Sequence, residues 1–480
     1  MQVRKVRFLE PGAPPYRRTP INLFVYDRYI RTPSVGLLTL ATIVHERIPD
    51  TFMYSESISH IIWDDVLDAD VVFLGAFTFA APRCYALADR VRRESDTVVV
   101  IGGLHASMCP EEAALHADYV LLGEGDETIL ELIDALERGG KPEFEGIAWV
   151  EDGKLHSPGF APVPHDIDTI PDRNLLYNYR KMAGHNTIWG QVHASRGCPH
   201  NCDYCALVGL YGHKVRTRPP ESVVEDIRRT IAFHDEGHHR IAKMLWITDD
   251  NFFADRAWAL RVLQAIIDSD IDYRFTVQAR YEVGFDNEML DMLVRAGFAE
   301  LSMGIEFIDD EAFEEFHKKS TRNDIIASIR NIQAHGMRVR GLFIFGAESN
   351  QLGIGRRVAD FVIDNDIRGI LLQSMYFVPG TPAYREYEDA LLHKDWNLYN
   401  GCVVHRPRNL SPAQLQEEMI TCSKRVYSLK RLEHALARYR GLDLVLFLGE
   451  FFWQMSERAN WRKNLKRLKR LDDDGKESSA

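Results

Sequence analysis

Three closely spaced cysteines constrain this chain more than any other feature of its sequence. Cys198, Cys202 and Cys205 form a Cys-x3-Cys-x2-Cys run directly after a predicted strand. Three thiolates at this spacing can hold three corners of a 4Fe-4S cubane, which leaves the fourth iron open for an external ligand. A Zn²⁺ site is the alternative, and it would need a fourth ligand close by, for which His213 is better placed than His200.

The residues around these cysteines alternate strand and helix patterns, as expected of an α/β protein. Residues 190–385 predict a partial (β/α)6 barrel. Its six strands are expected at 192–195, 244–248, 274–279, 300–305, 339–345 and 370–377. Amphipathic segments such as 221–234 and 287–296 separate the strands and predict helices. Because the cysteines follow the first strand, we expect the chemistry at the C-terminal strand ends.

Residues 1–140 show a different alternation, which is typical of a doubly wound, Rossmann-like parallel sheet. Buried strands are predicted at 71–75, 97–101 and 119–122, and each runs into glycine. Ligands of such sheets bind at these strand ends.

Two further regions complete the predicted organisation. Residues 141–189 read as a linker that contains a hairpin across 151–153. Residues 386–480 read as a helical C-terminal region, in which Ser411 caps a helix. The polar tail beyond Asp472 is expected to be disordered.

Charge and cysteine content exclude several classes of protein. The formal net charge of −12 argues against nucleic-acid binding over much of the surface, so a small hydrophobic substrate is favoured. Seven cysteines, three of them clustered, indicate metal ligation in a reducing compartment, and the start of the chain lacks a signal-peptide pattern. We therefore expect a cytoplasmic protein. The remaining cysteines are expected to be buried apolar residues: Cys84, Cys109, Cys402 and Cys422.

The cysteine loop resembles that of the radical S-adenosylmethionine superfamily, in which an aromatic residue, here Tyr204, directly precedes the third cysteine. This resemblance covers roughly residues 190–385. It implies that the open iron binds S-adenosylmethionine and that reductive cleavage yields a 5'-deoxyadenosyl radical. It also implies cofactor contacts from Tyr204 in the cysteine loop and, at the strand ends, from Asp249, Asp250, Gln278, Arg280, Ser302, Glu306, Gly341 and Gly346.

Several of these residues have an ordinary structural explanation as well. Asp249 and Asp250 could cap a helix, Glu306 could belong to a buried salt bridge, and Gly341 could mark a β-bulge. The residues alone leave both explanations open.

The order of the two domains is similar to that of the cobalamin-binding subfamily. The resemblance rests on the Gly102-Gly103-Leu104-His105 and Gly123-Glu124-Gly125 segments. It implies that cobalamin contacts come from Gly75, Thr78, Gly102, Gly103, His105 and Gly123. The Asp-x-His-x-x-Gly loop that supplies a cobalt-ligating histidine in many cobalamin domains is absent. Cobalamin held without a protein ligand to cobalt and an empty domain both remain open.

The function implied by this resemblance is cobalamin-dependent methylation of an unactivated carbon in a lipid, isoprenoid or tetrapyrrole. A flavodoxin or ferredoxin would supply electrons. Two alternatives stay open, namely a cobalamin-independent radical cyclisation, coupling or desaturation, and a non-catalytic metal-binding protein. The aromatic-polar segment 393–399 is expected to cover the substrate.

The C-terminal region carries a second signal, in which the apolar segment 444–453 is followed by a basic cluster at 462–470. Such a helix can lie on an anionic membrane surface. A helix that packs on the barrel and exposes a charged end explains the same residues.

Overall fold

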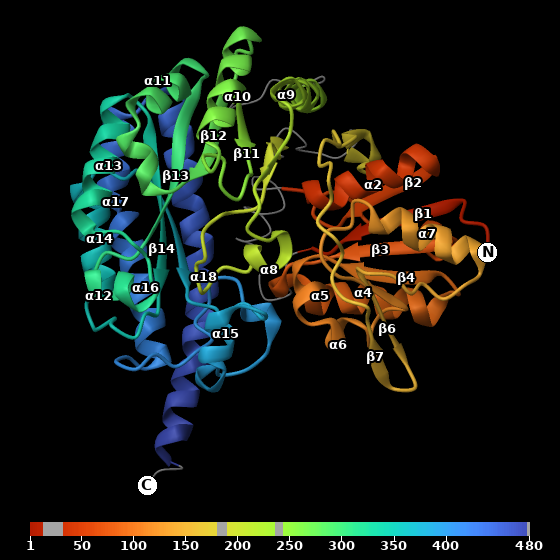
Figure 1. Cartoon of the computed structure of the whole chain (residues 1–480). Helices are drawn as coiled ribbons and strands as arrows, with labels where there is room; N and C mark the ends of the chain where they lie inside the picture. The colour runs from red at the N-terminus through yellow and green to blue at the C-terminus, as the bar shows by residue number, and fades with distance from the viewer. Residues whose placement is uncertain (13–31, 180–189, 236–242, 478–480) are drawn as a thin grey trace.

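The computed structural model describes residues 1–12, 32–179, 190–235 and 243–477 and places an N-terminal domain beside a partial barrel, with a helical C-terminal region (Figure 1). The predicted fold class is confirmed.

The N-terminal domain is built on a seven-stranded sheet in the order β2-β1-β3-β4-β5-β6-β7. Its strands are β1 Lys5–Glu10, β2 Asp50–Ser55, β3 Val71–Gly75, β4 Val98–Gly102, β5 Tyr119–Leu121, β6 Ile147–Glu151 and β7 Lys154–His156. Strands β1 to β5 are parallel, and their order is a doubly wound one in which ligands bind at the C-terminal edge.

Strands β6 and β7 run antiparallel and form the predicted hairpin, whose turn residues Asp152 and Gly153 have positive φ angles of 52° and 72°. Both strands lie within the segment 141–189 that we expected to be a linker. They join the N-terminal sheet because β6 pairs with β5 through Ala148 and Ile147, which are fully buried.

Helices cover both faces of this sheet because its central strands are apolar on both sides. Val71 and Phe73 of β3 pack with α2 (Val35–Arg47) and α7 (Thr128–Arg138). Val72 and Leu74 point the other way and pack with α4 (Ala81–Glu94) and the short helices α5 (Leu104–Met108) and α6 (Pro110–Ala113). Helix α3 (Trp63–Leu67) lies on this second face.

The barrel is an open, parallel six-stranded sheet in the order β15-β14-β13-β12-β11-β8. Its strands are β8 Gly190–Val192, β11 Met244–Ile247, β12 Arg274–Ala279, β13 Phe298–Glu306, β14 Arg338–Phe345 and β15 Gly369–Ser374. The helices are α9 Pro220–Asp235, α10 Arg256–Asp268, α11 Asn287–Arg295, α12 Asp310–Glu315, α13 Arg322–Ala334 and α14 Ile354–Asp364.

The first predicted barrel strand is divided in the structure. Strand β8 ends at Val192, and β9 (Ser195–Arg196) pairs antiparallel with β10 (Arg216–Thr217). The chain thus leaves the barrel sheet just before the cysteines.

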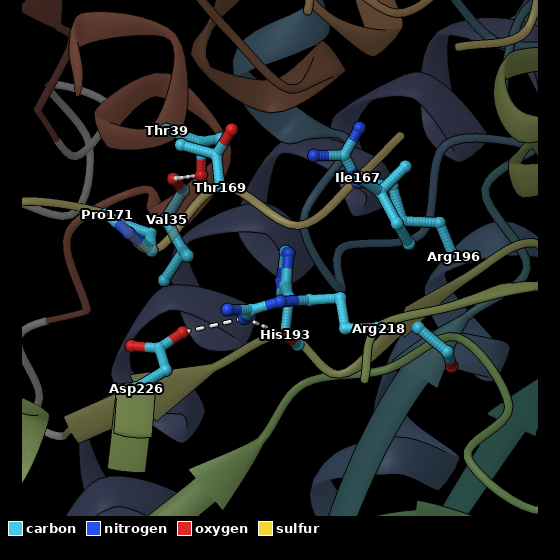
Figure 2. A pocket seen from close by; sticks show the side chains of 10 residues that line it. Val35, Thr39, Ile167, Thr169, Pro171, His193, Arg196, Arg218 and Asp226 are labelled. Carbon is cyan, nitrogen blue, oxygen red and sulfur yellow. Dashed lines mark hydrogen bonds and ion pairs between the residues drawn. The ribbon is translucent and has the colours of Figure 1, made fainter. Parts of the chain in front are cut away.

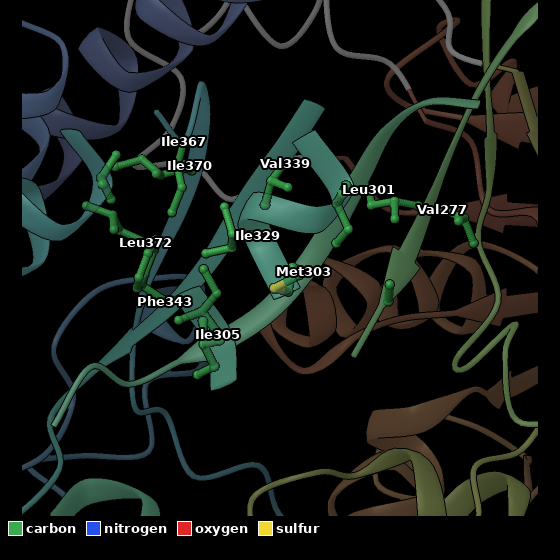
Figure 3. Close-up of a cluster of buried hydrophobic side chains, with 14 of the residues drawn as sticks. Val277, Leu301, Met303, Ile305, Ile329, Val339, Phe343, Ile367, Ile370 and Leu372 are labelled. Carbon is green, nitrogen blue, oxygen red and sulfur yellow. The ribbon is translucent and has the colours of Figure 1, made fainter. Parts of the chain in front are cut away.

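The barrel core is formed by apolar strand residues that meet the helices around the sheet (Figure 3). Leu301 and Met303 of β13 lie beside Val339 and Phe343 of β14, and Ile329 of α13 packs with them. Burial of each such side chain stabilises the folded protein by on the order of 1.5–3 kcal/mol. This core therefore holds the strand ends in fixed positions.

The C-terminal region consists mainly of α15 (Pro382–Glu386), α16 (Pro412–Val426), α17 (Leu429–Arg438) and the long α18 (Gly441–Glu477), which extends beyond the barrel in Figure 1. The predicted helix start is confirmed, since Ser411 and Gln414 form a capping box. The expectation of a disordered tail beyond Asp472 is wrong for residues 473–477, which continue α18. Within the described residues, no helix is long and apolar enough to cross a membrane.

Candidate metal centre

The cysteine loop runs from β9 to the short helix α8 (Leu207–Tyr211) at the junction of the two domains. Gly197 has a φ of 91°, and a Cβ atom there would collide with the Lys214 carbonyl, so the loop entry requires glycine. The backbone N–H of Cys205 donates to the Cys202 carbonyl at 3.0 Å and closes the turn between them. Cys198, Cys202 and Cys205 are all partly accessible.

The spacing of the three sulfur atoms distinguishes between the two kinds of metal centre. They do not all lie within 4.8 Å of one another, whereas thiolates on a single tetrahedral Zn²⁺ are about 3.8 Å apart. A cubane sets its ligands farther apart because each thiolate binds a different iron. Asn251 Nδ2 also lies 3.9 Å from Cys198 Sγ, close enough to donate to sulfur. The residues therefore fit a 4Fe-4S cluster.

Asp249 and Asp250, at the end of β11, hold the backbone that leads into the cysteine loop. Asp249 accepts from the Ala194 N–H and the Ser195 hydroxyl, both at 2.6 Å, and Asp250 accepts from the Gly197 N–H at 3.1 Å. Burial raises the pKa of Asp249 to about 7 and that of Asp250 to about 6. Neither residue caps a helix, because α10 is capped by Asp255. Their direct contact with a cofactor stays a prediction.

A charged group lies at the C-terminal end of β13, next to the loop. The Lys318 ammonium donates to the Gly304 carbonyl at 2.8 Å and contacts the Glu306 carboxylate, whose residue has a φ of 59°. Burial, together with the positive charge of Arg280, lowers the pKa of Lys318 to about 7. Glu306 thus belongs to a buried ion pair, and the sequence alone did not identify Lys318 because it lies in no motif.

The other barrel residues of the predicted site lie at neighbouring strand ends, except Tyr204, which lies in the cysteine loop. Gln278 of β12 lies in register with Ser302 of β13. Tyr204 makes an edge contact with Phe316, with ring centroids 5.9 Å apart. Arg280 pairs with Glu282 at 2.9 Å.

Gly341 of β14 and Gly346, which directly follows this strand, are each explained by a close neighbour. A Cβ atom at Gly341 would lie 3.2 Å from the Ile305 side chain and 2.5 Å from the Phe343 ring. Gly346 has a φ of 113°, and its Cβ would lie 2.6 Å from the His405 ring. Both positions therefore need glycine for packing, and their contact with adenine stays a prediction.

Part of the predicted cobalamin site lies together at the C-terminal edge of the N-terminal sheet. Gly75 and Gly102 are in register, and Gly103, with a φ of 91°, packs against Ala76. Thr78 is buried, and its hydroxyl has no hydrogen-bond partner among the described residues. Glycines that allow close approach and an unpaired hydroxyl fit a polar ligand at this edge.

The other two residues predicted to bind cobalamin, Gly123 and His105, contact neighbouring protein residues instead. The Gly123 N–H donates to the Ser107 hydroxyl at 3.0 Å, and Ala161 covers this glycine. His105 is buried against Trp396, with ring centroids 5.2 Å apart.

The buried Glu124 and the partly buried Asp126 connect the N-terminal domain to the barrel. Glu124 pairs with Arg216 at 2.6 Å and with Arg196 at 2.7 Å, and Asp126 pairs with Arg196 at 2.8 Å. Arg196 lies two residues before Cys198. These ion pairs place the end of β5 directly beside the cysteine loop, a relationship that no spacing in the sequence indicates.

The small cavity of Figure 2 lies at the same junction, between α2, segment 167–171 and the start of β9. Arg218 spans it and pairs with Asp226 at 2.8 Å. Its volume of about 10 Å³ has room for roughly one water molecule, so it is a packing gap rather than a cofactor site.

Two family models match this chain. Residues 192–350 match the radical SAM superfamily, and residues 31–133 match the B12 binding domain. The first match contains the cysteine loop and strands β11 to β14, and the second contains strands β2 to β5.

Curated relatives match most of the chain. It is 24% identical to the bacteriochlorophyllide d C-12(1)-methyltransferase of Chlorobaculum tepidum, over 83% of this chain and 84% of that protein. It is 23% identical to the hopanoid C-2 methylase of Rhodopseudomonas palustris, over 92% and 84% respectively.

The fold is similar to that of the radical S-adenosylmethionine methyltransferase TsrM from Kitasatospora setae, solved with cobalamin and a [4Fe-4S] cluster bound. The TM-score is 0.67 at 16% identity, and the alignment covers 98% of this chain and 100% of that one. The arrangement of a doubly wound domain, a partial barrel and a helical region is thus shared along the whole chain.

Proposed function

Because this chain belongs to the radical S-adenosylmethionine superfamily and carries a B12-binding domain, we propose that it methylates an unactivated carbon of a hydrophobic, multi-ring molecule. The observation that carries this proposal is the ion-pair connection of Glu124 with Arg196 and Arg216. It brings the ligand-binding edge of the N-terminal sheet beside the cysteine loop, so that both cofactors would face one space.

The cofactors of this enzyme are a 4Fe-4S cluster, S-adenosylmethionine and cobalamin. When bound, the cluster supplies the electron that cleaves S-adenosylmethionine to a carbon radical, and cobalamin carries the methyl group. The chain itself would hold the cluster through Cys198, Cys202 and Cys205. Asp249 and Asp250 would keep the loop in place through the backbone bonds described above.

The polar wall at the ends of β12 and β13 suits the methionyl part of S-adenosylmethionine. On binding, Arg280 would exchange its partner Glu282 for the cofactor carboxylate, and Glu306 would exchange its partner Lys318 for the cofactor amino group. Ser302 and Gln278, on the same strands, offer neutral hydrogen-bonding groups.

The substrate class is proposed from the relatives. Their names specify a bacteriochlorophyllide and a hopanoid, which are both rigid, largely apolar ring systems. Segment 393–399 supports such a substrate because it packs on the N-terminal domain through Trp396 and Tyr399, near the edge where cobalamin would bind.

The decisive experiment is anaerobic reconstitution with iron, sulfide and hydroxocobalamin, followed by reaction with methyl-deuterated S-adenosylmethionine and dithionite. We expect 5'-deoxyadenosine together with a trideuterated methyl group in a bacteriochlorophyllide or a hopanoid. The Cys202→Ala variant should form neither product, while Cys422→Ala, which removes a cysteine far from the loop, should retain both.

Two outcomes would decide against methylation. A substrate that is consumed without gaining the label would favour radical cyclisation, coupling or desaturation. Reconstituted protein that forms no 5'-deoxyadenosine at all would leave only a non-catalytic metal-binding role.

The electron donor is proposed to be a reduced flavodoxin or ferredoxin, because the cluster needs one electron for each cleavage. The test replaces dithionite with reduced flavodoxin in the same assay. Formation of 5'-deoxyadenosine at a comparable rate would support this donor class, and its absence would exclude flavodoxin.

A peripheral membrane contact is proposed for α17 and α18. Leu429, Leu436, Phe452 and Met455 are exposed apolar residues on these helices, and basic residues follow on α18 at 462–470. Co-flotation with phosphatidylglycerol vesicles but not with phosphatidylcholine vesicles would support this contact. If the protein floats with neither kind of vesicle, this contact is contradicted.

A further inference from the structure

A second group of metal-ligating side chains lies in the N-terminal domain, apart from the cysteine loop. It consists of His105 on α5, Cys109 between α5 and α6, and Glu112 on α6. His105 is only 1% exposed, and neither of its ring nitrogens has a hydrogen-bond partner among the described residues. Because a buried, unpaired polar side chain is costly, this imidazole requires an explanation.

The distances within the group are those of shared ligands rather than of hydrogen bonds. His105 Nε2 lies 3.6 Å from Glu112 Oε1, which is too long for a hydrogen bond between these atoms. Two such atoms bound to one tetrahedral ion at ordinary bond lengths lie about 3.3 Å apart. The ligand atoms of all three residues lie within 4.8 Å of one another, so small side-chain movements would bring them to one centre.

We propose that His105, Cys109 and Glu112 bind one divalent transition-metal ion of the Zn²⁺ type. Imidazole nitrogen, thiolate sulfur and carboxylate oxygen are the three ligand classes that Zn²⁺ takes in proteins. A water molecule would complete the tetrahedron.

The surroundings of Glu112 support this assignment. Trp396 Nε1 donates to both carboxylate oxygens, at 2.8 and 3.0 Å, and so fixes the orientation of the carboxylate. Hydrogen bonds of this kind commonly orient a metal ligand. The carboxylate keeps lone pairs for an ion, since each oxygen can accept more than one partner.

The position of the site suggests what the ion does. Trp396 comes from a short 3-10 helix, η8 (Trp396–Leu398), and is 284 residues away from Glu112 in sequence. An ion at His105, Cys109 and Glu112 would hold α5 to α6 and, through Glu112, keep η8 on the N-terminal domain. We therefore assign the ion a structural role.

The test uses Co²⁺ as a spectroscopic probe in the full chain with Cys198, Cys202 and Cys205 replaced by serine, so that the loop cannot bind the metal. We expect one equivalent of Co²⁺, with tetrahedral visible bands and a thiolate-to-cobalt charge-transfer band. Cys109→Ser on this background should abolish the charge-transfer band, and Glu112→Gln should weaken binding at least tenfold. Glu111→Gln removes the same charge one residue away on the exposed side and should bind as the parent does.

A second measurement covers the case in which a variant folds poorly. The parent here is the protein in which Cys198, Cys202 and Cys205 are replaced by serine. Zn²⁺ should raise its thermal unfolding midpoint, and excess chelator should reverse the increase. Parent protein that binds no Co²⁺ and is not stabilised by Zn²⁺ would overturn the proposal. Co²⁺ binding that survives Cys109→Ser with an unchanged spectrum would overturn it as well.

Discussion

Glu124 of the N-terminal domain and Arg216 of the barrel form a buried, bidentate ion pair, with N···O distances of 2.6 and 3.0 Å. Arg196 adds a third contact to the same carboxylate. The two domains are thus joined at the residue pair that flanks the cysteine loop, since Arg196 precedes the loop and Arg216 follows it. A change at Glu124 should therefore affect both domain docking and the metal centre.

Glu124→Gln is expected to destabilise the protein by about 3 kcal/mol, because it leaves Arg216 buried without its counter-charge. Thermal unfolding followed by circular dichroism measures the change, and iron content after reconstitution should decrease in parallel. Glu127→Gln is the control, since Glu127 is exposed and lies three residues away. Equal unfolding midpoints for the two variants would show that the pair does not stabilise the junction.

Asn251→Leu is expected to make the cluster harder to reduce. Asn251 Nδ2 lies 3.9 Å from Cys198 Sγ, and an N–H···S bond stabilises the added electron. If this hydrogen bond stabilises the reduced cluster by about 1 kcal/mol, its loss makes the reduction potential roughly 40 mV more negative for a one-electron couple. A redox titration followed by electron paramagnetic resonance measures the shift. The exposed Asn323→Leu should leave the potential unchanged, and a positive shift in Asn251→Leu would contradict the contact.

Gly380→Ala should destabilise the docking of the N-terminal domain. Gly380 has a φ of 85°, and its Cβ would collide with Met108 of α5. An alanine in the left-handed backbone conformation alone costs about 1 kcal/mol of stability. Gly153→Ala measures this cost separately, because Gly153 has a φ of 72° and no neighbour within 4 Å.

The double variant Gly380→Ala/Met108→Ala isolates the collision. We expect Gly380→Ala to lower the unfolding midpoint more than Gly153→Ala does, and the added Met108→Ala to recover part of the difference. Strictly additive effects of the two substitutions would show that these residues do not touch in solution.

Stability should depend on pH through His405. Burial lowers the pKa of His405 to about 4, from the ordinary imidazole value of 6.5. The unfolded chain then binds more protons between these values, so stability is complete above pH 6.5 and decreases as the pH falls toward 4. The full loss amounts to about 3 kcal/mol at 1.36 kcal/mol per pKa unit.

Unfolding midpoints measured at several pH values between 7 and 4.5 test this dependence. His405→Gln should make the profile less steep, with His193 and His393, whose pKa values burial also lowers to about 4, accounting for the remaining slope. The exposed His434→Gln should leave the profile unchanged. An unchanged profile in His405→Gln would assign the pH dependence to other groups.

The sequence alone determined the features that depend on local pattern. The spacing of Cys198, Cys202 and Cys205 is a matter of a few residues, and the barrel strands are recognisable because buried parallel strands are almost continuously apolar. The wrong assignment of β6 and β7 to a linker has a local origin too. The sequence shows the turn residues of this hairpin, but it does not show that β6 pairs with β5.

Only the tertiary structure decided how these parts meet. Lys318 reaches Glu306 from a loop without a motif, Glu124 pairs with arginines about 70 and 90 residues away, and Trp396 reaches Glu112 across 284 residues. Such contacts depend on how strands and helices pack in space. The residues around a side chain in sequence do not indicate which distant residue it contacts. The chemistry of the cysteine loop could therefore be read from its own residues, whereas the residues that support it could be identified only from the folded chain.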